Sequence, residues 1–139
     1  MTDYNGEGEV IASPDLDGPR AWAHVMYGLH ALSAISGVLT SATVVGAFVF
    51  GWPSLVAVII NYLTRERVRG TWLESHWRWQ MRTFWYAAAW GLFAAVLALT
   101  VIGLVVAIPA IVIAGLWVLY RVIRGWMVLL DRRPMPLPE

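Results

Sequence analysis

The first apolar stretch of the chain carries a series of polar side chains: His24, Tyr27, His30, Ser33 and Ser36. Imidazole titrates near neutral pH, and ionisable groups inside a membrane commonly serve proton or ion pathways. Around a helix, His24 and His30 lie about 120° apart, which does not make a close pair of metal ligands. The candidate polar site is therefore Tyr27, His30 and Ser33. Structural hydrogen bonding is the favoured interpretation, and a proton or ligand site and a metal site remain as alternatives.

A second group of functional candidates lies between residues 65 and 82, where arginines alternate with tryptophans. Tryptophan and arginine at a bilayer surface anchor a protein to headgroups, and anionic lipids add about 1 kcal/mol per basic residue. The same residue types dominate protein-binding hot spots. Both interpretations stay open for the candidate lipid or partner surface, which consists of Arg69, Trp72, His76, Trp77, Arg78, Trp79 and Arg82.

Catalytic chemistry finds little support in the sequence. The chain has no cysteine, and it contains no HExxH, no Gly-rich phosphate loop and no Ser/His/Asp set. The carboxylates nearest the apolar stretches, Glu66 and Glu74, have arginine neighbours that keep them ionised. A formal net charge of +1 gives no argument for nucleic acid. We therefore predict a protein that is not an enzyme, with no catalytic residues, no cofactor and no metal.

The elements that must position these residues follow from the charge pattern. No charged residue occurs in the 44 residues from Ala21 to Thr64, or in the 38 from Thr83 to Tyr120. The chain is 59% hydrophobic, and its mean hydropathy is +0.63. Because about 20 apolar residues span a bilayer core, each stretch is about two spans long. We predict an all-α integral membrane bundle of two transmembrane hairpins, with helices at 22–40, 52–63, 71–102 and 109–130.

Arginine positions predict the orientation of these helices. All ten basic residues are arginines, and they fall before, between and after the two apolar stretches. By the positive-inside rule, this pattern places both termini in the cytoplasm of a bacterium, with the protein in its inner membrane. The transmembrane domain spans residues 21–131. An acidic tail at 1–20 is expected to be disordered, and a Pro-rich tail at 132–139 is expected to be extended and frayed.

Local signals refine the helix ends. Pro53 fits the first turn of a helix after a turn at residues 41–51, although a re-entrant half-helix after Pro53 is an alternative. Thr71 and Glu74 match a capping box, so the third helix is expected to extend from residue 71 into the cytoplasmic interface. Small residues repeat every four positions and predict close helix contacts, within the bundle or across a dimer: Ser33, Gly37 and Ser41, then Ala87, Gly91 and Ala95.

The order of these motifs resembles a known family. His30 is followed by a glycine-broken turn, then by Pro53 opening a helix that ends in Asn61-Tyr-Leu-Thr-Arg65, and then by an arginine-rich segment with His76. Over residues 25–131 this resembles the bacterial Tic20-like (DUF4870) family of small four-helix membrane proteins. The family often has Asn-Phe-Gln after the histidine, whereas this chain has Trp-Arg-Trp-Gln80.

The resemblance implies a part in membrane protein complexes, because plastid relatives of the family are associated with protein import. The expected function is a non-enzymatic interaction or scaffold subunit of a membrane complex. Its expected partners are the lipid bilayer, with anionic lipids among its components, and a protein partner or a second copy of the chain. The alternative is a small oligomeric channel or carrier for a proton or a lipid-like solute, which would use His30 and Tyr27.

Overall fold

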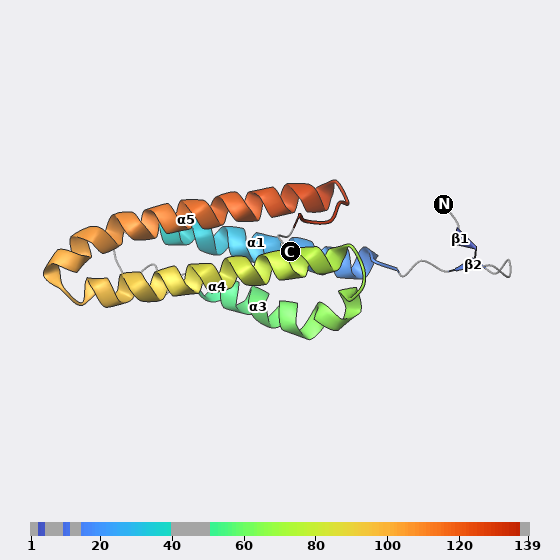
Figure 1. The fold of residues 1–139 in the computed structure, drawn as a ribbon, viewed down its shortest axis with the longest axis horizontal. Helices are drawn as coiled ribbons and strands as arrows, with labels where there is room; N and C mark the ends of the chain where they lie inside the picture. The colour runs from blue at the N-terminus through green and yellow to red at the C-terminus, as the bar shows by residue number, and fades with distance from the viewer. Residues whose placement is uncertain (1–2, 5–9, 12–14, 40–50, 137–139) are drawn as a thin grey trace.

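The computed structural model describes residues 3–4, 10–11, 15–39 and 51–136. The fold is all-α apart from one pair of two-residue antiparallel strands, β1 and β2. Four long helices and one short 3-10 helix, η1, make up the remainder of the described chain (Figure 1). The elements are β1 Asp3–Tyr4, β2 Val10–Ile11, α1 Asp17–Leu39, α3 Trp52–Thr64, η1 Arg65–Val68, α4 Leu73–Ala98 and α5 Val101–Leu130.

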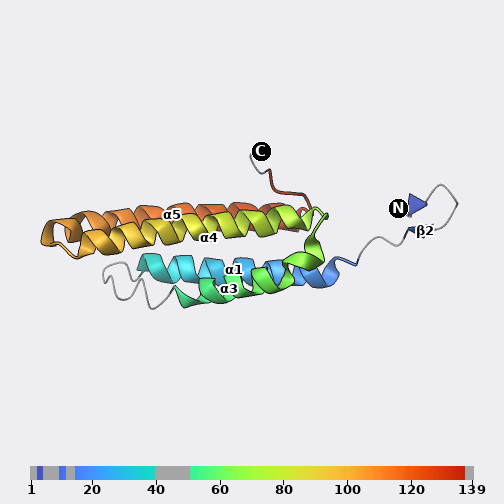
Figure 2. The same cartoon turned by 60° about the horizontal axis from the view of Figure 1, so that its bottom comes forward.

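The four long helices lie alongside one another in two layers. Figure 2 shows α4 and α5 together in one layer, with α1 and α3 in the other. Helix α4 packs mainly against α5, whereas α1 packs against both α5 and α3. Contacts between α1 and α4, and between α3 and α4, are few. Helix α1 is therefore the central element of the fold, and it stays apart from α4 over much of its length.

Within the described part of the chain, one helical stretch is long and apolar enough to cross a membrane. This stretch, Val105–Leu130, lies in α5, and only 11% of its most apolar 18-residue segment is buried inside the protein. Helix α3 has 13 residues and is roughly 20 Å long, shorter than a bilayer core of about 30 Å. The predicted turn at 41–51 falls almost entirely on residues 40–50, outside the described residues, so the re-entrant alternative stays a prediction.

The first helix begins earlier than expected. It starts at Asp17, inside the segment assigned to a disordered tail. Asp15 Oδ1 accepts a hydrogen bond from the backbone N–H of Asp17 at 3.0 Å, and Pro19 lies in the first turn. A capping carboxylate followed by an early proline is a helix-start signal, and it explains why the helix extends beyond the apolar stretch.

The α4–α5 connection differs from the predicted turn at 103–109. Helix α4 ends at Ala98 and α5 begins at Val101, so the reversal takes place at Leu99 and Thr100. Thr100 has extended backbone angles, and its hydroxyl accepts a hydrogen bond from the Gly103 N–H at 2.9 Å. Thr100 is therefore the N-cap of α5, and Pro109 lies inside this helix.

The predicted capping box forms only in part. Helix α4 begins at Leu73, and its N-cap residue, Trp72, makes no side-chain cap. The Thr71 hydroxyl donates to the Val68 carbonyl at 2.7 Å instead of accepting from the helix. Glu74 does reach backward, because its carboxylate accepts from the Gly70 N–H at 2.9 Å. Gly70 has φ +76°, a conformation that favours glycine at this turn.

Candidate functional site

Tyr27 and His76 form the centre of a buried network at the arginine-rich end of the helices. Their side chains are fully buried, and the Tyr27 hydroxyl lies 3.0 Å from His76 Nδ1. His76 Nε2 lies 2.8 Å from the backbone carbonyl of Arg133. Since a carbonyl only accepts, Nε2 carries the proton, and in the neutral ring Nδ1 accepts from the Tyr27 hydroxyl. Burial lowers the pKa of His76, and the hydrogen bond to Arg133 raises it to a smaller extent.

The C-terminal segment takes part in this network. Helix α5 ends in a Schellman turn, in which Arg132 has φ 54° and the Arg133 N–H donates to the Val128 carbonyl. The chain then turns back over α4, where the Met135 N–H donates to Ser75 Oγ at 2.8 Å. Met135 is only 4% exposed. The predicted frayed tail is therefore packed against α4 as far as Met135.

The candidate lipid or partner surface does not form as one surface. Its side chains at Arg69, Arg78 and Arg82 are exposed and Trp72 is half-buried, but His76, Trp77 and Trp79 are buried. These three side chains are therefore not available to the predicted surface. Residues 73, 76, 77, 80 and 83 follow helical spacing and are all buried. The inward face of α4 therefore takes two of the tryptophans and the histidine, and the outward face keeps the arginines.

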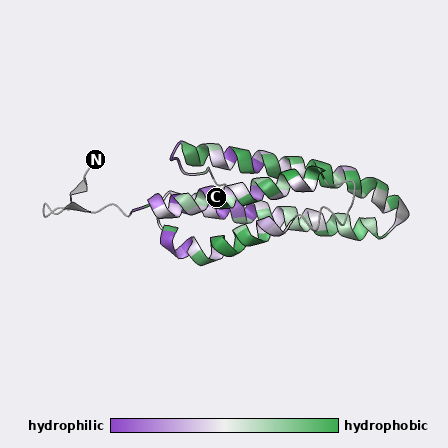
Figure 3. Ribbon diagram, turned by 180° about the vertical axis from the view of Figure 1, so that it is seen from behind, coloured by the Kyte–Doolittle hydropathy of each residue, from purple (hydrophilic) through white to green (hydrophobic). Residues whose placement is uncertain are grey.

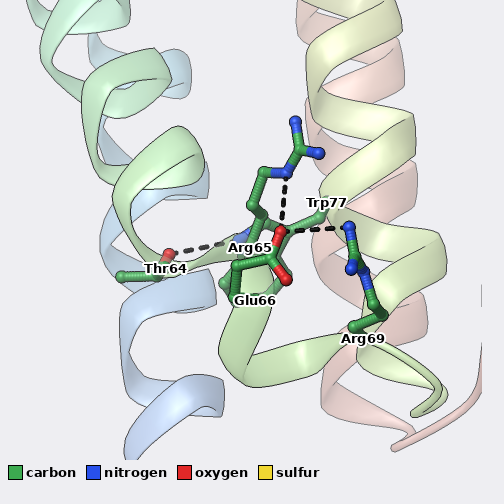
Figure 4. Close-up of polar contacts among 5 residues, drawn as sticks. All are labelled: Thr64, Arg65, Glu66, Arg69 and Trp77. Carbon is green, nitrogen blue, oxygen red and sulfur yellow. Dashed lines mark hydrogen bonds and ion pairs between the residues drawn. The ribbon is translucent and has the colours of Figure 1, made fainter.

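Figure 4 shows how the buried and exposed parts meet at the α3–η1 junction. The Trp77 indole N–H donates to the Thr64 hydroxyl at 3.1 Å. On the outside, the Glu66 carboxylate pairs with Arg65 at 3.4 Å and with Arg69 at 3.1 Å. Arg65 and Arg69 therefore share Glu66 as a counter-ion.

The polar residues of α1 divide between two sites. His30 Nδ1 lies 3.0 Å from Ser54 Oγ, and Ser33 Oγ accepts from the Ser54 N–H at 3.3 Å. Ser54 therefore contacts both His30 and Ser33, whereas Tyr27 belongs to the His76 network. Ser54 was missed from the sequence. It follows Pro53 in the first turn of α3, but only the packing of α3 on α1 brings it to the histidine.

A cavity of about 250 Å³ adjoins the His30–Ser54 pair, between α1, α4 and α5 and the start of α3. Its polar lining comes from His30, Ser33, Ser54 and Thr83. The remaining walls are apolar, and most are small: Ala34, Gly37, Gly51, Phe84, Ala87, Ala88, Trp90, Gly91, Ala95, Ile111, Ala114, Gly115 and Val118. An apolar pocket with a few polar groups is the usual form of a ligand site in a protein.

The rows of small residues create this space instead of closing it. Among the described residues, a Cβ added at Gly37 or Gly91 would meet no heavy atom within 4 Å, apart from the glycine's own local backbone. Close helix contacts occur elsewhere, on α5. A Cβ at Gly115 would lie 2.6 Å from Val38 Cγ2, and one at Gly125 would lie 2.5 Å from the Tyr27 hydroxyl. The predicted contacts within the bundle are therefore wrong at Gly37 and Gly91, the contact across a dimer stays a prediction, and Ser41 lies outside the described residues.

The chemistry available to the His30 pair is limited. Among the described residues, no group of three or more His, Asp or Glu side chains is placed to hold a metal. The three histidines have separate partners. His76 contacts Tyr27, His30 contacts Ser54, and His24 accepts from the Trp126 indole at 2.9 Å. His30 and Ser54 have the spacing of a base and a hydroxyl nucleophile, but no carboxylate lines the cavity to orient the imidazole. The pair can hydrogen-bond a ligand or pass a proton.

Gln80, four residues after His76 on α4, has a buried side chain without a hydrogen bond of normal geometry within the described residues. The Gln80 amide is 2% exposed, and within the described residues neither its nitrogen nor its oxygen has a partner of normal geometry.

Comparisons with known proteins add no assignment, because no family model, curated protein or solved structure matches the chain.

Proposed function

We propose that this chain is a non-enzymatic, multi-pass protein of the bacterial inner membrane whose interhelical cavity binds and carries a small lipid-like solute. The observation that carries the proposal is the cavity beside His30 and Ser54. Its small apolar walls suit a hydrocarbon chain, and its polar lining suits a hydroxyl or carboxyl group on the same molecule. This is the carrier interpretation of the sequence, with Ser54 in the place that Tyr27 was expected to take.

The exposed surface supports embedding of all four helices. Large apolar side chains are exposed on each of them, including Leu39 on α1, Leu63 on α3, Phe93 on α4 and Ile102 on α5. Soluble proteins rarely expose contiguous apolar patches of this kind. Figure 3 shows hydrophilic residues gathered at the end nearest the chain termini, with the other end hydrophobic. With the arginines at that hydrophilic end, the positive-inside rule makes it cytoplasmic.

A second candidate, the interaction or scaffold subunit, has its own supporting observation. A groove of about 350 Å³ lies between α3 and α4 at the arginine-rich end. Tyr62, Arg78 and Trp85 line it, and tyrosine, arginine and tryptophan are the residue types most enriched in binding hot spots. This groove would serve a protein partner, in line with the complexes that the Tic20-like resemblance implies.

Filling the cavity tests the carrier proposal. The probe is a fluorescent fatty acid, 11-(dansylamino)undecanoic acid, titrated into purified protein in detergent. Ala87 lines the cavity, whereas Ala89 is exposed on the same helix and does not. We expect Ala87→Leu to weaken probe binding at least tenfold and Ala89→Leu to leave it unchanged. Equal binding by the two variants, with both remaining folded by circular dichroism, would contradict the proposal.

A further inference from the structure

A second candidate site lies on the α4–α5 pair, around Arg121. The Arg121 guanidinium carbon lies 3.6 Å from the centroid of the Trp79 ring and 5.0 Å from that of Trp117. Its Nε donates to the Thr83 hydroxyl at 2.8 Å, and the Trp79 indole donates to the Arg121 carbonyl at 3.1 Å. These contacts fix the guanidinium between α4 and α5, with its orientation set by an aromatic surface and one hydrogen bond.

The two terminal nitrogens of Arg121 are still available to a ligand. Among the described residues, its only side-chain hydrogen bond is the one from Nε to Thr83. A guanidinium held at Nε presents its terminal N–H groups as a planar fork, which is the geometry that matches the oxygens of a phosphate or carboxylate. The site is therefore a preorganised receptor for an anion.

A second arginine increases the positive charge here. The Arg124 guanidinium carbon is 5.8 Å from the centroid of the same Trp79 ring that Arg121 covers. In the described part of the chain, all ion pairs use other arginines: Arg20, Arg65, Arg69 and Arg133. Two adjacent guanidinium groups without a carboxylate repel each other, and an anion bound between them offsets that repulsion.

The surroundings of this cluster indicate the source of the anion. Arg121 and Arg124 lie inside Val105–Leu130, the stretch apolar enough to cross a membrane. Trp117 and Tyr86 pack edge to face beside them at 6.2 Å, and such rings are typical of the headgroup region. A charge at the edge of the hydrocarbon needs a compensating partner. A lipid phosphate supplies that charge at this depth, while its acyl chains cover the exposed apolar side chains of α5.

We propose that Arg121 and Arg124 bind the phosphate headgroup of an anionic phospholipid on the α4–α5 surface. The site requires membrane embedding but is separable from the carrier proposal through Arg124, which neither lines the cavity nor bonds the cavity residue Thr83, as Arg121 does. A variant that closes the cavity should leave headgroup binding intact, and loss of Arg124 should leave the fatty-acid probe binding intact. Failure of one proposal is thus distinguishable from failure of the other.

Native mass spectrometry of the full chain in detergent tests the site, with phosphatidylglycerol as the anionic probe and phosphatidylcholine as the neutral one. We expect the chain to retain one phosphatidylglycerol and to lose phosphatidylcholine at the same collision energy. Arg121→Gln and Arg124→Gln should each weaken phosphatidylglycerol retention about fivefold, the effect of one basic residue near a lipid surface. Arg69→Gln is the matched control, because it removes the same charge from an arginine already paired with Glu66.

Three results would overturn the proposal. Equal weakening by Arg69→Gln would show that net charge, not this site, holds the lipid. Equal retention of phosphatidylcholine would remove the role of the anion. Displacement of phosphatidylglycerol by millimolar inorganic phosphate would make free phosphate the ligand. If Arg121→Gln fails to fold, because Arg121 bridges Trp79 and Thr83, the exposed Arg124→Gln decides the outcome.

Discussion

The two halves of the helical body differ in packing, because one surrounds its buried polar groups closely and the other leaves a cavity beside them. At the arginine-rich end, Tyr27, His76 and Trp77 are buried and hydrogen-bonded, and Gly125 allows α5 to pack directly on the Tyr27 ring. In the other half, Gly37 and Gly91 face the cavity instead of a neighbouring helix. The same class of small residue closes one contact and keeps another open.

Hydrogen bonds between the helices are concentrated at the arginine-rich end of the described structure. Buried hydrogen bonds with correct geometry connect α1, α3, α4, α5 and the C-terminal segment at one end. Polar pairing of this kind is costly to disrupt, because the partner left behind is buried and unsatisfied. The cavity half has fewer such bonds and more room, so it can accept a ligand without losing the arrangement of the helices.

The largest expected effect on stability comes from removing the imidazoles of His76 and His30 in turn. His76→Ala should lower the free energy of unfolding by about 3 kcal/mol, since it removes a fully buried ring, leaves the buried Tyr27 hydroxyl without its His76 partner and breaks the bond to the Arg133 carbonyl. His30→Ala should cost about 1 kcal/mol, because His30 already borders open space. Unfolding by sodium dodecyl sulfate, followed by circular dichroism, measures both. Equal losses would mean that the two halves do not differ in this way.

A matched pair of glycine substitutions tests the packing difference next. Gly125→Ala should destabilise the protein by about 2 kcal/mol, because the new methyl group would overlap the buried Tyr27 ring. Gly91→Ala should stabilise it by about 0.5 kcal/mol, since helical glycine is replaced and no neighbour is met. The same unfolding assay reports both signs. A destabilising Gly91→Ala would show that the cavity half is closed in solution.

The smallest expected effect is the contribution of His76 to the pH dependence of stability. Burial holds the pKa of His76 below its unfolded value of about 6.5, so the unfolded chain binds more protons between the folded and unfolded pKa values. The His76 contribution should therefore be constant above about pH 6.5 and should lower stability as the pH falls below that value. Comparing the unfolding midpoints of the wild type and His76→Ala at pH 7.5 and pH 5 isolates this contribution. An unchanged pH dependence in the variant would assign it to other groups.

Part of the structure could be predicted before it was seen. The all-α fold and an apolar membrane-length helix before Arg132 follow from composition and charge spacing alone. The candidate polar site of Tyr27, His30 and Ser33 stays a prediction, since His30 and Ser33 each contact Ser54 and Tyr27 contacts His76. Helix ends were less accurate, since Asp15 and Thr100 cap their helices through side-chain bonds that outweigh hydropathy.

The functional surface could not be predicted to the same extent. Trp77 and Trp79 have the composition of an interfacial surface, but whether a helix face is buried depends on which neighbour covers it. The arginine pattern predicts only the membrane orientation of Arg121. Its side chain is oriented by Trp79, 42 residues away, and by Thr83, 38 residues away. Contacts at such separations leave no local pattern in the sequence.

The helical fold and the charge-free stretches follow from the amino-acid sequence, because local composition and the cost of placing charge in an apolar surrounding set both. The pairing of Tyr27 with His76, the contact of Ser54 with His30, and the different roles of the glycines depend on tertiary packing. A small side chain permits the close approach of two helices but does not enforce it. The packing of the remaining side chains sets the distance between helices.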